Sequence, residues 1–175
     1  MDKGLSLVKA DISEFDFVYD ALERNFIPEE RRDREDALAL LMKGAYTVYH
    51  ILDEAERVGF ITVWELSDSG FIEHFVVYEA YRNRGYGASA LELLKGKYKK
   101  LVLEAEPPTD GMPARRVAFY ERCGFARNEQ YYFQPPYREG GEGVELVLMS
   151  WPTRLDGFQV TVREIYANVY NKNFF

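Results

Sequence analysis

A run of glycine and arginine residues is the part of this sequence whose spacing most clearly predicts chemistry. Residues 82–88 read RNRGYGA, and apolar residues at helical spacing follow directly, as far as Leu94. The first turn of a helix has backbone N–H groups without intrahelical partners and carries partial positive charge. Glycine lets an anionic group approach that backbone closely, and the two arginines add full charges. The run therefore predicts a phosphate-binding loop at the start of a helix.

Two familiar nucleotide-binding motifs do not fit this run. A P-loop needs a lysine after its last glycine, whereas Gly87 is followed by Ala88. A dinucleotide-binding motif needs a further glycine three positions after Gly87, where the chain has Ala90. The simpler alternative, a glycine turn beside two surface arginines, stays open at this point.

The elements needed to position the loop follow from hydrophobic patterns along the chain. The aromatic and β-branched run at 71–78 predicts a strand before the loop, and 86–98 predicts the helix after it. Further strands are predicted at 5–10, 45–52, 57–66, 100–106, 125–133 and 143–150. Further helices are predicted at 13–26, with a cap at Ser13 and Asp16, and at 32–44, 113–124 and 160–171. Together these predict a single α/β (α+β) domain over residues 1–175, with a mixed, mostly antiparallel sheet of about seven strands flanked by helices.

Composition narrows the class of protein. Of the 175 residues, 47% are hydrophobic and 15% aromatic, which predicts a folded domain with a sizeable core. The formal net charge of −7 argues against general binding of nucleic acid, which usually needs a basic face. No apolar run approaches the roughly 20 residues of a membrane span, and the first residues lack a secretory signal, so we expect a cytoplasmic protein that does not bind a membrane. The single cysteine, Cys123, excludes an internal disulfide and a cysteine-based metal site, and we expect no metal.

Two signatures in this order resemble the GNAT superfamily of acyl-CoA-dependent N-acyltransferases. Residues 82–88 are similar to its Arg/Gln-x-x-Gly-x-Gly/Ala pyrophosphate loop. Residues 119–125, FYERCGF, are similar to its later segment of the form Ala-x-x-Phe-Tyr-x-x-x-Gly-Phe, although Ala118 stands one residue nearer to the Phe-Tyr pair than in that form. The resemblance covers about residues 5 to 150, and two motifs in the correct order are far more specific than either alone.

The resemblance implies that acetyl-CoA is the co-substrate and that the loop and the strand before it hold it. Backbone groups of the loop would bind the pyrophosphate, and Arg82 and Arg84 would add charge. The strand would pair with the pantetheine arm through its backbone. The residues assigned to the coenzyme in this way are Phe75, Val76, Val77, Arg82, Asn83, Arg84, Gly85, Tyr86, Gly87 and Ala88.

The resemblance also implies direct transfer of an acyl group, most simply acetyl, from the thioester to a primary amine. The amine must lose a proton and the departing thiolate must gain one, so the site needs a proton acceptor and a proton donor. Tyr120 stands at the position of the family's usual donor. Glu73, on the strand before the loop, is the first candidate for the acceptor, and His74 or a water molecule are the alternatives. Strand alternation would send Glu73 and His74 to opposite faces.

The amine acceptor itself is left open by the sequence. A small cationic molecule and a protein amine fit equally well, and residues 131–137, YYFQPPY, predict either an aromatic wall of the acceptor pocket or a packed proline turn. Residues 162–175 predict either a homodimer contact or a helix packed on its own domain. Two other functions compete: an acyl-CoA-binding sensor without catalysis, and an interaction domain whose glycine loop is only a turn.

Overall fold

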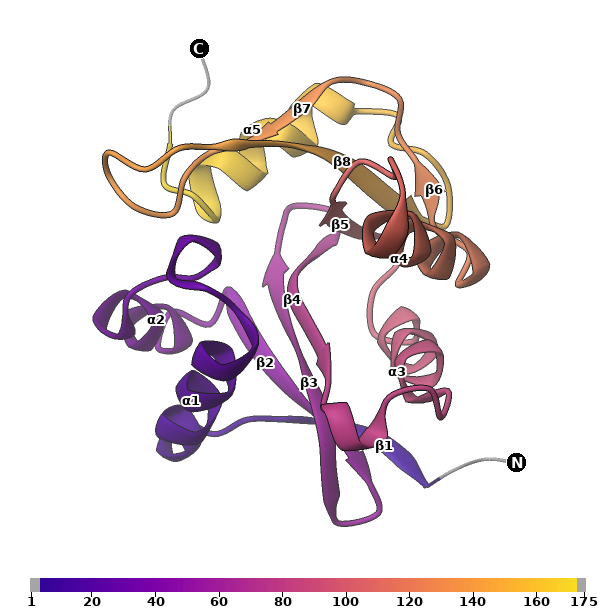
Figure 1. The fold of residues 1–175 in the computed structure, drawn as a ribbon. Coiled ribbons are helices and arrows are strands. Elements are labelled where there is room, and N and C mark those ends of the chain that lie inside the picture. Colours follow the sequence, from indigo (N-terminus) through magenta and orange to yellow (C-terminus); the bar gives the residue numbers. More distant parts are fainter. Residues whose placement is uncertain (1–3, 173–175) are drawn as a thin grey trace. The chain divides into compact units, whose positions relative to one another are not determined.

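The computed structural model describes residues 4–172, which divide into two compact units (Figure 1). The N-terminal unit comprises the described residues up to Trp64 together with Glu73–Lys97. The C-terminal unit comprises Glu65–Ile72 together with the described residues from Tyr98 onward. Strand β4, Gly70–Val77, therefore contributes residues to both units.

The N-terminal unit is built on strands that follow one another in chain order. Strand β2 (Tyr46–Asp53) pairs antiparallel with β1 (Leu5–Lys9) on one side and with β3 (Glu56–Glu65) on the other, and β4 follows β3. Helices α1 (Phe15–Asn25) and α2 (Arg34–Leu41) lie on one side of these strands, and α3 (Tyr86–Lys95) lies on the other (Figure 1). Short 3-10 helices occur at Ile12–Glu14, Pro28–Glu30 and Glu79–Tyr81.

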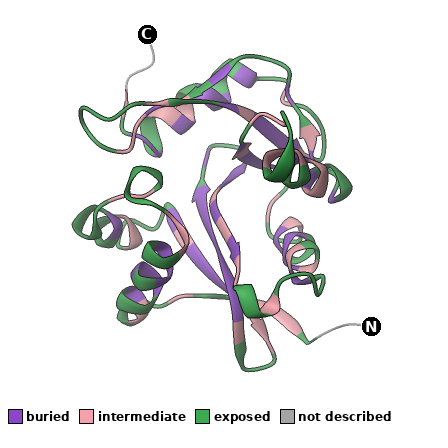
Figure 2. Cartoon of the chain, viewed as in Figure 1, coloured by how far each residue is buried: buried purple, intermediate pink, exposed green. Residues whose placement is uncertain are grey.

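The core of the N-terminal unit lies between its strands and the apolar faces of its helices. Figure 2 shows β2 and β3 buried over most of their length, whereas the helices are buried along one side only. The apolar residues of this unit with 0% exposure are Ile51, Val58, Ile61 and Val63 from the strands and Ala90, Leu91 and Leu94 from α3. Each large apolar side chain buried in this way contributes about 1.5–3 kcal/mol, which fixes α3, and with it the loop at its start, on this unit.

The C-terminal unit is organised around strand β8 (Val144–Trp151). Strand β5 (Leu101–Ala105) pairs antiparallel with β8 and parallel with the first residues of β4, in the register Gly70 to Leu101. The short strands β6 (Ala126–Arg127) and β7 (Tyr132–Gln134) also pair antiparallel with β8. Helices α4 (Gly111–Arg122) and α5 (Phe158–Asn168) complete the unit.

The predicted fold class is confirmed: helices flank a mixed, largely antiparallel sheet. The described residues form eight strands instead of about seven, because the single strand predicted at 125–133 is divided into β6 and β7. Asn128, 2% exposed, lies at the break. Its Nδ2 donates to the carbonyl of Leu148 and to Oγ of Ser150, and its Oδ1 accepts from the backbone N–H of Leu155. These side-chain hydrogen bonds replace part of the strand ladder.

The predicted cap at the start of α1 needs correction. The cap before α1 is not made by Ser13 and Asp16 but by Asp11, whose carboxylate accepts from Ser13 N–H while Glu14 accepts from Asp11 N–H. A 3-10 turn therefore precedes α1.

The prediction of one domain over residues 1–175 stays a prediction, and the last three residues of the 162–175 segment lie outside the described residues. In the part of the chain that the structure describes, no helix is long and apolar enough to cross a membrane.

Candidate functional site

The start of α3 has the backbone geometry that the glycine-arginine run predicts. Gly85 precedes the helix in the left-handed conformation, with φ 82° and ψ 1°, and Asn83 also has a positive φ of 60°. Such angles favour glycine, and asparagine tolerates them better than most residues. No side chain caps the first turn, so its N–H groups are presented by the backbone alone. The residues with positive φ turn the chain just before α3, so the N–H groups of its first turn lie directly after the loop.

Contacts on both sides hold this loop while leaving it exposed. Tyr86 is buried and donates from its hydroxyl to the carboxylate of Asp53, which anchors the first helical residue. On the other side, Arg82 Nε donates to the carbonyl of Val77 at 3.0 Å. The guanidinium of Arg84 lies 5.8 Å from the ring centroid of Tyr81. Residues 82–85 are all exposed, so two positive charges and an uncapped helix start face solvent together.

The end of β4 lies immediately before the loop and is packed tightly against β3. Tyr78 N–H donates to the carbonyl of Val58 at 2.8 Å. A Cβ placed on Gly59 would lie 2.1 Å from the carbonyl oxygen of Val76, a distance that no side chain can occupy. Val76 is buried, and its neighbours Phe75 and Val77 are half-buried. Gly59 therefore lets β3 pack directly against the backbone of β4 at the segment predicted to bind pantetheine.

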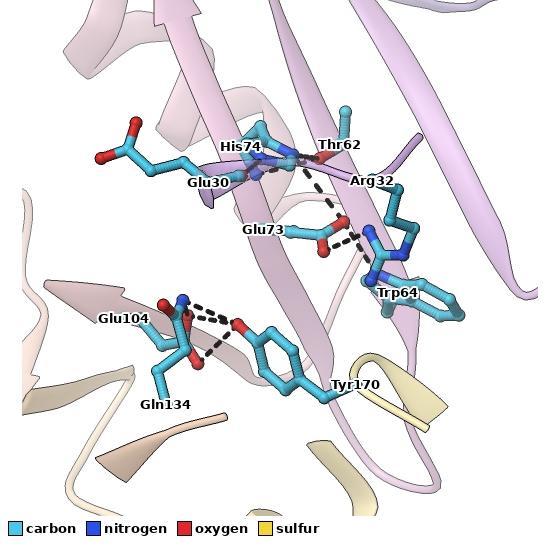
Figure 3. A network of polar contacts seen from close by, with 9 residues as sticks. All are labelled: Glu30, Arg32, Thr62, Trp64, Glu73, His74, Glu104, Gln134 and Tyr170. Carbon is cyan, nitrogen blue, oxygen red and sulfur yellow. Dashed lines mark hydrogen bonds and ion pairs between the residues drawn. The ribbon is translucent and has the colours of Figure 1, made fainter. Parts of the chain in front are cut away.

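Glu73, the predicted proton acceptor, is held by two donors (Figure 3). Its side chain is 0% exposed, Arg32 Nη1 lies 2.5 Å from Oε1, and Trp64 Nε1 donates to Oε2 at 3.0 Å. Arg32 also lies over the Trp64 ring, 5.1 Å from its centroid. Burial alone would raise the pKa of Glu73, but the Arg32 charge and the hydrogen bonds from Arg32 and Trp64 hold the pKa below its usual value. Glu73 is therefore an ionised carboxylate at neutral pH.

His74 fastens the chain between α1 and α2 to β4. Its Nε2 donates to the carbonyl of Glu30 at 2.9 Å, and its Nδ1 lies 3.4 Å from Thr62 Oγ1 (Figure 3). The centroid of its ring is 4.4 Å from that of Phe26. Burial lowers the pKa of His74 despite the neighbouring carboxylate. The ring is therefore neutral at pH 7, and both nitrogens are engaged within the fold.

The prediction that Glu73 and His74 face opposite sides of the strand is wrong. Glu73 Oε2 lies 3.7 Å from His74 Nδ1. The two side chains reach Trp64 and Thr62, which are two residues apart on β3 and so share one face. Regular alternation is therefore broken between Glu73 and His74, and both side chains meet the segment around Arg32.

Tyr120 lies on α4 in the C-terminal unit. It is 8% exposed, and its ring centroid is 5.3 Å from that of Phe119 and 5.9 Å from that of Phe125. Burial raises the pKa of Tyr120 to about 12, so its hydroxyl keeps its proton at neutral pH. Gly124, with φ 83°, ends the helix, and the N–H of Phe125 returns to the carbonyl of Tyr120 at 3.0 Å. The residues of the Phe-Tyr-x-x-x-Gly-Phe motif therefore contact one another at the end of α4. Cys123 within it is buried.

Two groups of polar residues were missed by sequence reasoning. Arg32 and Trp64 surround Glu73 from positions 41 and 9 residues away, and no motif links them. In the C-terminal unit, the carboxylate of Glu104 accepts hydrogen bonds from Gln134 and Tyr170 (Figure 3) and also from Tyr132. The aromatic run at 131–137 indicated this second group only in part, because its neighbouring tyrosines differ: Tyr132 is buried, whereas Tyr131 is 68% exposed. Among residues 4–172, no three His, Cys, Asp or Glu side chains are grouped as around a metal ion.

The chain can be compared with known proteins. It matches the Acetyltransferase (GNAT) family over residues 15–125. A Bacteroides thetaiotaomicron structure classed as a GNAT-family acetyltransferase is 32% identical, with a TM-score of 0.87, over 97% of this chain and 99% of that one. YjbC of Bacillus subtilis strain 168, also classed as an acetyltransferase, is 24% identical over 157 residues, 87% of this chain and 80% of that protein. Arabidopsis thaliana NAA60 in complex with acetyl-CoA shares the fold, with a TM-score of 0.65 and 14% identity over 84% of this chain and 97% of that one.

The family match spans more than half of the chain, and it includes the glycine-arginine loop and the Phe-Tyr motif on α4. The fold agrees with that of the Bacteroides thetaiotaomicron structure over nearly the whole length. On these grounds the chain belongs to the GNAT acetyltransferase family and is an acetyltransferase enzyme.

Proposed function

We propose that this enzyme transfers an acetyl group from acetyl-CoA directly to a primary amine of its acceptor. The observation that carries the proposal is the start of α3, where a left-handed Gly85 leads into an uncapped first turn. The coenzyme pyrophosphate is the group that this arrangement suits, because it is anionic and compact enough to accept several backbone N–H groups at once. The exposed Arg82 and Arg84 add charge beside it.

In this proposal the coenzyme contacts are those assigned from the family resemblance. The pyrophosphate binds the N–H groups of residues 83–88, and the pantetheine arm runs along the backbone of residues 75–77. Both segments belong to the N-terminal unit, and the buried face of α3 and the close packing at Gly59 hold them in place. The reaction needs no metal. We place the enzyme in the cytoplasm, a reducing compartment in which its single, buried cysteine would stay a thiol.

The proposed chemistry takes two protons from the acceptor nitrogen and gives one proton to the departing sulfur. The acceptor ammonium first loses a proton, and its nitrogen then attacks the thioester carbon. As the C–S bond breaks, the nitrogen loses its second proton, which passes to the Tyr120 oxygen once that oxygen has protonated the thiolate. We assign the departing thiolate's proton to the Tyr120 hydroxyl, which is protonated at neutral pH because its pKa is about 12. Glu73 is ionised and can accept the ammonium's proton through water, since its own side chain is fully buried. His74 positions the neighbouring segment and is not the base, because both ring nitrogens are engaged.

Calorimetric titration with acetyl-CoA tests the coenzyme site, and thiol release with a panel of primary amines tests the reaction. Two variants, Gly87→Glu and Arg84→Glu, should each weaken binding of acetyl-CoA at least tenfold. A glutamate near a helix N-terminus favours the helix, so Gly87→Glu should remain folded while it repels the pyrophosphate. The matched control is Lys43→Glu, an exposed charge reversal after α2.

Equal binding of acetyl-CoA by the wild type and Gly87→Glu would place the pyrophosphate elsewhere and overturn the assignment. Binding without thiol release for any amine would contradict amine transfer while leaving the coenzyme site intact.

A further inference from the structure

The turn between strands β2 and β3 is hydrogen-bonded to the glycine-arginine loop in the N-terminal unit. The Tyr86 hydroxyl donates to Oδ2 of Asp53, the last residue of β2. The Tyr81 hydroxyl donates to Oε1 of Glu56, the first residue of β3, at 3.1 Å. Tyr81 and Tyr86 stand at the two ends of the exposed residues 82–85. Two carboxylates of one turn therefore hold both ends of the exposed part of the loop.

The hydrogen bond between Tyr86 and Asp53 is the stronger of the two. Tyr86 is 7% exposed and Asp53 is half-buried, so little water competes for this bond. Glu56 is exposed, so water competes freely for the bond to Tyr81. The bond to Asp53 raises the pKa of Tyr86, so its hydroxyl keeps its proton and acts as the donor at neutral pH. Asp53 is therefore the main anchor of the loop, and Glu56 assists it.

Asp53 belongs to a part of the sheet that does not depend on the loop. It pairs with Leu5 of β1 on one side and with Glu56 of β3 on the other. Next to it, Glu54 has a positive φ of 56°, and its N–H donates to the carbonyl of Gly4 at 3.1 Å. The Asp53 carboxylate therefore projects from a fixed frame against which the loop can be held.

The loop needs such support because its backbone conformation is unusual. Asn83, with φ 60°, and Gly85, with φ 82°, are both left-handed, and residues 82–85 are exposed. A residue with a side chain keeps such angles only when surrounding contacts favour them. The apparent affinity for a ligand falls in proportion to the fraction of the protein in the binding conformation. Contacts that hold the loop therefore raise its affinity for a ligand without touching that ligand.

Electrostatic attraction does not account for a carboxylate at this place. The loop presents Arg82, Arg84 and the start of α3 to an anionic ligand, and a negative charge nearby repels such a ligand. The charge of Asp53 therefore opposes coenzyme binding, whereas its hydrogen bond to Tyr86 favours it. Removing the charge alone and removing the hydrogen bond should have different effects.

We propose that Asp53 is a positioning residue for the coenzyme, acting through Tyr86, and that Glu56 gives weaker support through Tyr81. This proposal rests on the acetyl-CoA binding proposed above. It assigns the β2–β3 turn a role in coenzyme affinity and none in the chemical step. Loss of the contact should therefore raise KM for acetyl-CoA and leave kcat at saturating acetyl-CoA unchanged.

Calorimetric titration of the whole protein with acetyl-CoA tests the proposal. Asp53→Ala and Tyr86→Phe should each weaken binding about five- to thirtyfold, because each removes one partner of a hydrogen bond to a charged group. Both changes remove the same contact, so the double variant Asp53→Ala/Tyr86→Phe should bind no more weakly than the weaker single variant. Asp53→Asn keeps an acceptor oxygen for Tyr86 and removes the charge, and it should bind at least about three times as tightly as Asp53→Ala.

Glu54→Gln is the matched control, because it removes an equal charge from an exposed position in the same turn. It should change acetyl-CoA affinity less than about twofold. Amide hydrogen exchange without coenzyme gives a second readout at Ser89, whose N–H donates to the carbonyl of Gly85. Exchange there should be faster in Tyr86→Phe than in the wild type, and unchanged in Glu54→Gln.

Several outcomes overturn the proposal. Tyr86→Phe keeps the buried ring, and equal affinity of this variant and the wild type for acetyl-CoA removes the positioning role. Equal affinity of Asp53→Asn and Asp53→Ala would show that the acceptor oxygen does not matter, and a lower kcat at saturating acetyl-CoA would place the contact in the chemical step.

Failure of this proposal is distinguishable from failure of the proposed function. Binding of acetyl-CoA by the wild type and equally by Tyr86→Phe removes only the positioning role. A wild type that does not bind acetyl-CoA removes the coenzyme site itself, and with it the role of Asp53 in coenzyme affinity. Hydrogen exchange at Ser89 would then still show whether Tyr86 holds the loop.

Discussion

Removing Arg32 should destabilise the protein strongly and in a pH-dependent way. The Arg32–Glu73 pair joins a carboxylate that is 0% exposed to a guanidinium whose side chain is 11% exposed, 2.5 Å apart. Arg32→Met keeps an extended apolar side chain against Trp64 but leaves a buried charge without its cation. Loss of one partner of a buried pair costs about 3–5 kcal/mol. For a chain of this size, that corresponds to a lower Tm by roughly 6–20 °C.

The pH dependence follows from the two pKa shifts. In the wild type the pKa of Glu73 is lowered below 4.5, so its contribution to stability is present above that pH and is lost as the pH falls through the folded-state pKa. In Arg32→Met, burial should dominate and raise the pKa of Glu73. The variant should then lose stability as the pH rises above about 4.5. The difference in unfolding free energy between wild type and variant should therefore be larger at pH 8 than at pH 5.

Urea unfolding at these two pH values measures the effect. The double variant Arg32→Met/Glu73→Gln removes the stranded charge and should recover most of the stability lost by the single variant. Arg34→Met is the control, because its pair with Asp16 is exposed and should contribute little. A loss below about 1 kcal/mol at pH 8, or a loss that Glu73→Gln does not reduce, would refute this account of the pair.

Three further changes test other parts of the structure. Gly59→Ala should cost about 1–3 kcal/mol of stability and weaken acetyl-CoA binding, because its Cβ would lie 2.1 Å from Val76 O, whereas Gly4→Ala meets only an ordinary 3.5 Å contact and should do neither. His74→Gln should lessen the loss of stability below pH 6.5 in thermal melts, because a buried histidine with a lowered pKa takes up its proton more readily when unfolded; an unchanged slope would contradict this. Tyr120→Phe should lower kcat about 10²- to 10⁴-fold in thiol-release assays without changing acetyl-CoA affinity, and full activity would exclude it as the proton donor.

Local patterns predicted the parts of the site that lie close together in the chain. The glycine-arginine run and the apolar stripe after it lie within 13 residues, so their types and spacing alone predict a helix start with exposed charges. The strands at 45–52 and 57–66 could be predicted in the same way, because their apolar residues and the short charged turn between them are contiguous in the sequence. Most of the fold class follows from such segments.

Contacts between distant residues could not be predicted in the same way. Arg32 lies in a charged stretch that reads as a solvated surface, and its pairing with Glu73 depends on how α1 and α2 pack against β4. Regular alternation failed at Glu73 and His74, because periodicity describes an ideal strand and not a local break. Division of the predicted strand at 125–133 depended on buried hydrogen bonds of Asn128 to residues about twenty positions away or more.

The double attachment of the segment between α1 and α2 limits how this enzyme can be re-engineered. Arg32 and the carbonyl of Glu30 bind adjacent residues of β4. If this segment were replaced by that of a relative, the new segment would have to form the same two contacts with β4. Exchange should succeed only when positions 32 and 73 are transplanted together. For the same reason, an alignment of relatives should show substitutions at these two positions occurring jointly, whereas position 30, which contributes its backbone, should vary freely.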